Sequence, residues 1–358
     1  MTPPADHPPA APPVDQRPVL RVRDQGELVA AVPAMLGFHP RESLVLMATG
    51  GLSGRRLGLT LRVDLPPPEH PQYAEHAELV VASAVCGLLL DEPTGAVAVV
   101  VSESGDPPGP LPHSLLAGRV ESALAAQQVP IRAVMWTERT TGGARWACYQ
   151  ACGCAGTVPD PATTPFVAAV VAEGKVVHAD RAALEAVVAP VDQDVLRRRE
   201  KRLIQSVDGQ LEGDTGAVVL EPDAGVFLVD AAIADSAAGR LALSDDDVVA
   251  LATALGIAEV RGWALQRTAG PGGAAAEHLW AALVRETPDP EAAEPAALLA
   301  VSALLRGDGA LANIALDRAE RAWPGHAFAG LVRRCAAAGV RPSQVRDTLL
   351  GGPTRDAR

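Results

Sequence analysis

Two different hydrophobic periodicities alternate along the first half of the chain. Ser43–Ala48 is an apolar run with strand character, and every second residue from Leu57 to Val63 is apolar, as in a half-buried strand. A glycine-rich loop at residues 50–54 separates the two runs. The pattern therefore predicts a β-hairpin.

Helical and strand-like segments follow one another after this hairpin. Apolar residues between Ala77 and Leu88 recur at three- and four-residue intervals, which is typical of a helix packed on one face. Ala96–Val101 and Ile131–Trp136 are continuous apolar runs of strand length, and Leu115–Ala126 between them has helical spacing. With a further strand expected at Ala144–Tyr149, the alternation predicts an α/β domain with a mixed sheet and packed helices.

Capping signals and proline-rich segments set the limits of this domain. Asp24 with Glu27 resembles a capping box, so a helix is expected over Leu28–Leu36, ended by Gly37. Helices at Pro165–Glu173 and Asp180–Val188 are expected to close the domain. We assign residues 1–18, rich in proline and alanine, to a disordered tail and residues 19–190 to the α/β domain.

The second half has an all-α pattern. We expect a helical and irregular connector over residues 191–243, a helical domain over 244–350 and a disordered tail over 351–358. Near residues 294–327 a helical hairpin has small or apolar residues where a tetratricopeptide repeat requires them. These positions are Ala300, Ala312, Leu316 and Ala319. Ala296 and Ala303 replace the large aromatic residues of the first helix, and only one repeat is found where a superhelix needs about three. The segment is thus either tetratricopeptide-like or a plain hairpin in a small bundle.

Charge and hydropathy limit the partners and the location. The net charge of −12 argues against nucleic-acid binding, because phosphate contacts require a basic surface. The one basic run, Arg197–Arg202, is interpreted as the solvated face of a charged helix. No stretch approaches the ~20 apolar residues of a membrane span, and no export signal is apparent. We therefore expect a cytoplasmic protein that binds neither nucleic acid nor membrane.

Four polar residues around the predicted hairpin form the first candidate site. Arg62 and Asp64 are two residues apart on one strand, so their side chains project to the same side of the sheet. With His39 and Ser43 they suggest a site for a small anion, in which Arg62 binds, Asp64 orients and His39 transfers a proton. The alternative is structural: an Arg62–Asp64 ion pair, His39 packed in a tight turn and Ser43 bonded to the backbone.

A cysteine cluster is the second candidate site. Cys148, Cys152 and Cys154 offer three thiolates of a tetrahedral zinc site, with His178 as a conceivable fourth ligand. The spacing also fits a reactive thiol pair or cysteines without a role. Arg145 and Trp146, just before the cluster, suggest a recognition surface, although a tryptophan on a strand is more often part of the core.

The order of these motifs resembles an actinobacterial family of domains of unknown function, number 4192. The resemblance begins at Val32–Pro40 (Val-Pro-Ala-Met-Leu-Gly-Phe-His-Pro) and extends over nearly the whole chain after the first tail. It also includes Ser43–Val45, Arg62–Pro66, Arg145–Trp146, Tyr149, Cys152, Cys154, Gly156–Pro159, Asp180–Ala182 and Arg306–Ala310. The cysteine segment departs from the family pattern, which often has an adjacent cysteine pair and more aromatic residues. The resemblance implies kinship and fold, and brings no reaction, substrate or cofactor with it.

Motifs of the common catalytic families are absent from the sequence. The glycines at 50, 51 and 54 match neither a phosphate-binding nor a dinucleotide-binding loop, and neither a Gly-x-Ser-x-Gly elbow nor a His-Glu-x-x-His helix occurs. We therefore expect a noncatalytic binding or protein-interaction protein with an unknown protein partner. The alternative is an enzyme or sensor for a small anionic ligand at His39, Ser43, Arg62 and Asp64.

Overall fold

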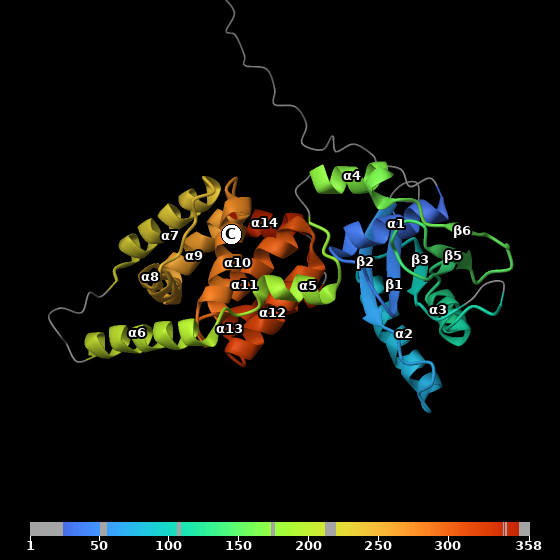
Figure 1. The fold of residues 1–358 in the computed structure, drawn as a ribbon, viewed down its shortest axis with the longest axis horizontal. Coiled ribbons are helices and arrows are strands. Elements are labelled where there is room, and N and C mark those ends of the chain that lie inside the picture. Colours follow the sequence, from blue (N-terminus) through green and yellow to red (C-terminus); the bar gives the residue numbers. More distant parts are fainter. Residues whose placement is uncertain are drawn as a thin grey trace, which may run out of the picture.

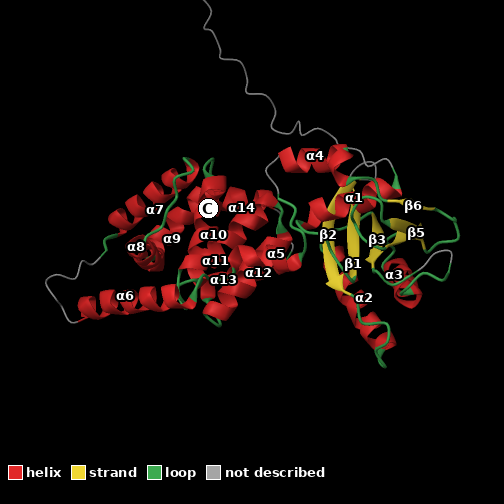
Figure 2. Ribbon diagram, viewed as in Figure 1, coloured by secondary structure: helices red, strands yellow, loops and turns green. Residues whose placement is uncertain are grey.

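A computed structural model describes residues 24–50, 56–105, 109–172, 176–211, 220–338, 340 and 342–350. The two predicted tails and most of the glycine-rich loop lie outside these residues. A six-stranded mixed sheet with helices comes first, and a mostly helical region follows it (Figures 1 and 2). The predicted fold class, an α/β part followed by an α part, is confirmed at this level.

The sheet is built around strands that are buried on both faces. Its strands are β1 (Ser43–Gly50), β2 (Arg56–Asp64), β3 (Gly95–Val101), β4 (Ile131–Thr137), β5 (Arg145–Cys148) and β6 (Ala155–Thr157). The spatial order is β2-β1-β3-β4-β5-β6, with β3 and β4 parallel and every other neighbouring pair antiparallel. Because β1 and β3 have helices on both sides, their sequences are continuous apolar runs.

Helices cover both faces of the sheet. α2 (Tyr73–Leu89) and α3 (Ser114–Ala126) bury their apolar sides together with Leu44 and Leu46 of β1. α1 (Gln25–Leu36) packs on the opposite face, where Val45 and Met47 point. Asp24 caps α1 by accepting a hydrogen bond from the Glu27 amide at 2.9 Å, and Gly37 ends it at a φ of 79°. The predicted cap at Asp24 and the end at Gly37 are confirmed, although the helix begins at Gln25, before Leu28, and an expected break at Pro33 is wrong because Pro33 lies inside the helix.

The direction of the strands brings polar loops to one edge. β2, β3 and β4 all run the same way, because β1 is antiparallel to both β2 and β3. Their carboxyl ends therefore share an edge of the sheet with the amino termini of α2 and α3. In open α/β sheets this is the edge at which ligand-binding residues collect.

A β-bulge changes the face of one predicted core residue. Pairing shifts by one residue between Met47 and Thr49, so Leu57 packs with the α1 face whereas Leu59 packs with the α2 and α3 face. The bulge includes Gly58, where an added Cβ atom would clash with a carboxylate oxygen of Asp91. The simple alternation expected from Leu57 to Val63 is therefore wrong at Leu57.

Short helices connect the sheet to the helical region. After the 3-10 helix η1 (Pro161–Thr163), α4 (Pro165–Ala172) packs on α1. α5 (Arg181–Glu185) and the 3-10 helix η2 (Ala186–Val188) follow, and they contact α10 and α12 of the helical region. The predicted helix from Asp180 thus lies between the two parts, and the domain division at residue 190 stays a prediction.

The helical region is a bundle around one buried helix. Its helices are α6 (Gln193–Leu211), α7 (Pro222–Ala237), α8 (Asp245–Gly256), α9 (Ala258–Ala269), α10 (Gly273–Glu286), α11 (Ala293–Arg306), α12 (Gly309–Ala322), α13 (Ala327–Ala337) and α14 (Pro342–Leu350). α11 is buried along almost its whole length and contacts α8, α9, α10, α12, α13 and α14. A helix surrounded in this way offers no concave face, so the plain hairpin in a bundle is favoured and the tetratricopeptide-like alternative is not confirmed. The connector expected over residues 191–243 was predicted to be partly irregular, but it also contains the helix α7.

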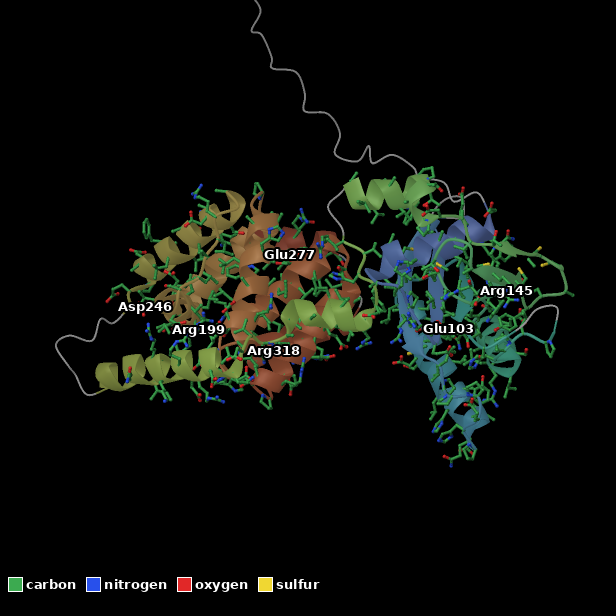
Figure 3. All side chains as sticks on the ribbon, viewed as in Figure 1. Glu103, Arg145, Arg199, Asp246, Glu277 and Arg318 are labelled. Atoms are coloured by element: carbon green, nitrogen blue, oxygen red, sulfur yellow. The ribbon has the colours of Figure 1, made fainter. Side chains whose placement is uncertain are left out.

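The basic run on α6 is not a uniformly solvated face. Arg197 is exposed and pairs with Asp194. The Arg199 side chain is only 6% exposed and donates to Asp245 of α8 at 2.8 Å. It also binds the Glu286 carboxylate and, at 2.7 Å, the Glu286 carbonyl. Figure 3 labels Arg199 on α6. The solvated-face interpretation is therefore wrong for Arg199, which fastens α6 to α8 and α10.

Within the described ranges no single helix has both the length and the apolar composition of a membrane span. α8 and α9 meet that test only when they are taken together across a bend of 100°.

Candidate metal centre

The three clustered cysteines lie at the turn end of the β5–β6 hairpin. Arg145 pairs with Thr157, Trp146 with Gly156 and Ala147 with Ala155, which places Cys148 directly opposite Cys154. The Cys148 amide donates to the Cys154 carbonyl at 2.9 Å, so the ladder continues to these two residues. Cys152 lies in the turn that follows, and Gly153 takes the left-handed conformation with a φ of 68°.

Trp146 fixes the hairpin on the sheet. It is 9% exposed and belongs to the core on the α1 face. Its indole nitrogen packs against two glycines. A Cβ atom added to Gly26 would lie 3.1 Å from this nitrogen, and one added to Gly156 would lie 3.2 Å from it. Arg145 is exposed and approaches Glu138 at 3.8 Å. Adjacent strand residues point to opposite faces, so Trp146 serves as core and does not share a recognition surface with Arg145.

The sulfur atoms of Cys148, Cys152 and Cys154 all lie within 4.8 Å of one another. A tetrahedral zinc ion with bonds of about 2.3 Å separates its sulfur ligands by about 3.8 Å, which small side-chain rotations can reach from here. All three thiols are free (Figure 3 shows sulfur atoms in yellow beside β5 and β6). The donor set fits a thiophilic ion, because soft thiolates favour zinc and copper(I) over magnesium or calcium.

Hydrogen bonds make the three thiols unequal. Two hydrogen bonds from Cys154 to the Cys152 sulfur lower the pKa of Cys152, first from the Cys154 thiol and then from the Cys154 amide, which lies 3.4 Å from that sulfur. The same contact with Cys152 raises the pKa of Cys154. Burial, followed by the neighbouring Cys152, raises the pKa of Cys148 to about 12. Cys152 is therefore the thiol that ionises first, and it is also the exposed one.

His178 is not part of the thiol group. Among the described residues the group of close ligand atoms contains the three cysteines alone. His178 forms an isolated bridge with Phe38, where its amide donates to the Gly37 carbonyl at 2.7 Å and its carbonyl accepts from the His39 amide at 3.2 Å. The fourth ligand considered from the sequence thus holds the end of α1 instead.

The structure brings three of the four predicted anion-site residues together at the sheet edge. Arg62 donates to the Ser43 hydroxyl at 2.8 Å and pairs with Asp64, and Ser43 donates to the Arg41 carbonyl at 2.6 Å. Ser43 is fully buried and the Arg62 side chain is 11% exposed, whereas Asp64 is exposed. These hydrogen bonds run from Asp64 through Arg62 and Ser43 to the Arg41 carbonyl and tie β1 to β2, as in the structural alternative.

His39 has a different partner. Its Nδ1 atom lies 2.9 Å from the Thr140 hydroxyl, in the loop after β4. Burial lowers the pKa of His39. No hydrogen bond among the described residues joins His39 to Ser43, Arg62 or Asp64. The proton-transfer arrangement proposed for these four residues therefore lacks its central contact.

The same edge holds polar residues that the sequence analysis missed. The Glu42 carboxylate accepts from the Ser102 hydroxyl and the Glu103 amide, both at 2.9 Å, and Glu42 has a left-handed φ of 38°. Nearby, the Tyr73 hydroxyl contacts Nδ1 of the buried His113 at 2.7 Å. Burial lowers the pKa of His113, against the effect of Glu42. The sequence did hold one indication of these residues: Ser102 directly follows the predicted strand Ala96–Val101, and residues at the carboxyl end of a strand often line a site.

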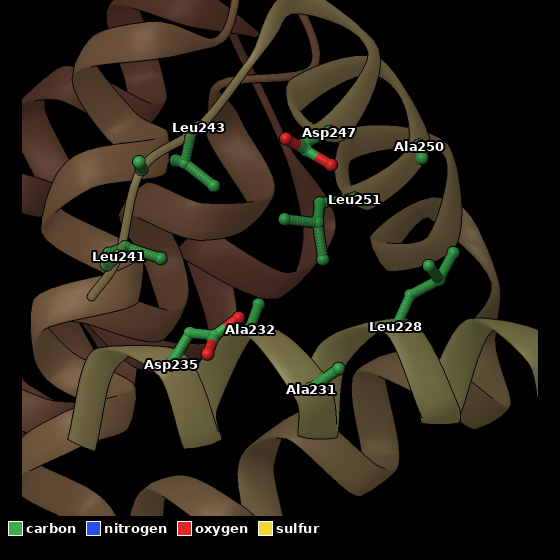
Figure 4. A pocket seen from close by; sticks show the side chains of 10 residues that line it. Leu228, Ala231, Ala232, Asp235, Leu241, Leu243, Asp247, Ala250 and Leu251 are labelled. Carbon is green, nitrogen blue, oxygen red and sulfur yellow. The ribbon is translucent and has the colours of Figure 1, made fainter. Parts of the chain in front are cut away.

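Two hollows of the structure lie in or beside the helical region, away from both sites. The first, of about 160 Å³, lies between α7 and α8, and Figure 4 shows Asp235 and Asp247 on its opposite rims. Asp235 pairs with Arg240 and Asp247 accepts from Ser244 in a capping box, so both carboxylates serve local structure. The second, of about 780 Å³, lies between α12 and the segment of α5 and η2.

Fold and site together define a two-part protein: a mixed-sheet α/β part carrying three convergent thiols, followed by a helical bundle. A family model described as a domain of unknown function, DUF4192, matches residues 26–343. The chain belongs to this family. No curated protein and no solved structure matches it.

Proposed function

We propose that this protein is a noncatalytic binding protein that holds one thiophilic metal ion, zinc in the first instance, on Cys148, Cys152 and Cys154. The convergence of three free sulfur atoms within 4.8 Å carries the proposal. The pairing of β5 with β6 creates this convergence, so the donors are already positioned before an ion arrives. A reducing cytoplasmic location, which we also propose, keeps such thiols free.

Contacts that do not involve the cysteine side chains anchor the hairpin, which favours binding over a purely structural role. Backbone hydrogen bonds close the ladder as far as Cys148 and Cys154, and Trp146 is packed in the core. Small zinc domains differ, because their folding depends on the metal. Ion binding here is expected to order the turn around Cys152 and to leave the sheet as it is.

Zinc titration against a chromophoric chelator tests the proposal. We expect one ion per chain, and Cys152→Ser should weaken binding at least about 10- to 100-fold, since loss of an outer-shell partner already costs that much. Cys86→Ser is the matched control, because Cys86 is exposed on α2 outside the cluster. A wild-type protein without bound zinc, or a Cys152→Ser variant that binds as well as the control, would refute the proposal.

The rival function, an enzyme or sensor for a small anion, has less support. Its cationic group, Arg62, already binds Ser43 and Asp64, and His39 is bonded to Thr140.

A protein partner remains part of the proposal, and the second hollow, between α12 and the segment of α5 and η2, is the place to examine for it. The net charge of −12 is the reason we expect no nucleic-acid partner.

A further inference from the structure

We infer that the fourth coordination position of the bound ion is the binding site for a low-molecular-weight thiol, so that the protein forms a ternary complex of thiol triad, metal and small thiolate. The inference rests on the proposed function and names the ligand class of the same site. It follows from the number of donors, from the space around them and from the softness of the ion they select.

The described part of the chain supplies three sulfur donors to the site and no fourth ligand atom close to them. Among the described residues no histidine or carboxylate joins the three cysteines in the group of close ligand atoms, and His178 lies outside it, with its backbone paired to Phe38. Zinc in proteins is almost always four-coordinate, and a site with three protein ligands leaves its last position to water or to an incoming molecule. The open position is therefore available to an external ligand.

The surroundings of the turn leave room for that ligand. Cys152 is exposed, while Cys148 and Cys154 are half-buried on the α1 face. Gly153, between two of the three cysteines, adds no side chain to the turn, and a Cβ atom built there would meet nothing within 4 Å, so the turn itself is uncrowded. A small molecule can thus approach the ion from the turn without moving the sheet, whereas the opposite side is closed by the ladder and by Trp146.

The chemistry of the triad favours sulfur as the incoming donor. Ions retained by three thiolates are soft or borderline and prefer a further thiolate to carboxylate or water. Sites with four cysteine thiolates are common for zinc, so the additional negative charge is tolerated. An ion held by the three cysteines would exchange a water for the thiolate: the metal–oxygen bond would break as the metal–sulfur bond forms, and the thiol proton would pass to the solvent. No oxidant or reductant is required.

Cobalt(II) substitution tests the inference, with 2-mercaptoethanol as the probe. Binding of cobalt to the triad gives sulfur-to-cobalt charge-transfer absorption, and addition of the thiol should raise it by about one third, the ratio of four thiolates to three. Ethylene glycol, the oxygen analogue, should leave the spectrum unchanged. Equilibrium dialysis at the same thiol concentration should show cobalt still bound to the protein.

The outcomes separate the two proposals. If the triad binds cobalt but the spectrum does not respond to 2-mercaptoethanol, or if the thiol strips the metal from the protein, the ternary complex is refuted and the metal site stands. If the wild-type protein and Cys152→Ser give the same cobalt spectrum, the proposed metal site itself is refuted. The inference is supported if the charge-transfer absorption rises with 2-mercaptoethanol but not with ethylene glycol, while dialysis shows that the cobalt stays bound to the protein.

Discussion

Cys148 and Cys154 face each other across the β5–β6 hairpin, joined by a hydrogen bond of 2.9 Å from the Cys148 amide to the Cys154 carbonyl. This relationship places two sulfur atoms on one face of the ladder and leaves the turn to bring the third. It makes the turn end of the hairpin a chelating unit when the thiols are reduced, and it keeps all three thiols close enough to react with one another on oxidation.

Oxidation of the metal-free protein is expected to join Cys152 to Cys148 or Cys154. Cys152 is exposed and its pKa is lowered, whereas the pKa values of Cys148 and Cys154 are raised, so the Cys152 thiolate is the nucleophile. Diamide takes up the two hydrogens as this bond forms, and the oxidised protein should lose its zinc binding. Peptide mapping by mass spectrometry checks the connectivity. Cys152→Ser is the control, and a disulfide between Cys148 and Cys154 alone in the wild type would contradict the prediction.

Arg199 is expected to contribute to stability far more than its neighbour Arg197. Arg199→Met removes charge-assisted hydrogen bonds to Asp245 and Glu286 and should lower the free energy of unfolding by about 2 kcal/mol. Arg197→Met changes an exposed pair within one helix and should cost less than about 0.5 kcal/mol. Urea denaturation followed by circular dichroism measures both. Equal losses for the two variants would show that the contact of α6 with α8 is not formed.

Asp245 should make the protein less stable in acid. Hydrogen bonds from Arg198, then from Arg199, lower the pKa of Asp245 to about 2 from an ordinary value of 3.8. The unfolded chain binds the proton more readily than the folded one, so this contribution is fully present above pH 4 and is lost as the pH falls towards 2. Asp245→Asn should be less stable at neutral pH and should lose less stability over this interval than the wild type. Unfolding curves at several pH values test it, and parallel profiles for the two proteins would rule it out.

Arg62 is expected to act as a structural residue. Arg62→Met breaks the bonds to Ser43 and Asp64 and should cost about 1 to 2 kcal/mol, because one of them reaches a buried hydroxyl. Phosphate at millimolar concentration should leave the melting temperature of both proteins unchanged. A rise in melting temperature for the wild type alone would revive the anion site, since a ligand that binds only the native state stabilises it.

The local pattern of residues determined much of the first half of this protein. Apolar runs set the strands, Asp24 and Gly37 set the ends of α1, and the two-residue spacing of Arg62 and Asp64 predicted that they share a face. Each of these features depends on neighbours within a few positions, where backbone geometry fixes the direction of side chains. The cysteine spacing likewise gave the candidate donors, although it could not show that they converge.

Tertiary structure decided the remainder. The bulge at Gly58 moved Leu57 to the other face, the approach of α8 and α10 buried Arg199, and the bridge at Phe38 held His178 away from the thiols. Pairing between β5 and β6 made a cluster of three cysteines from a linear spacing. Some of these contacts, such as Phe38 with His178, join segments far apart in the chain, and all of them depend on register and packing across elements, which a local pattern does not specify.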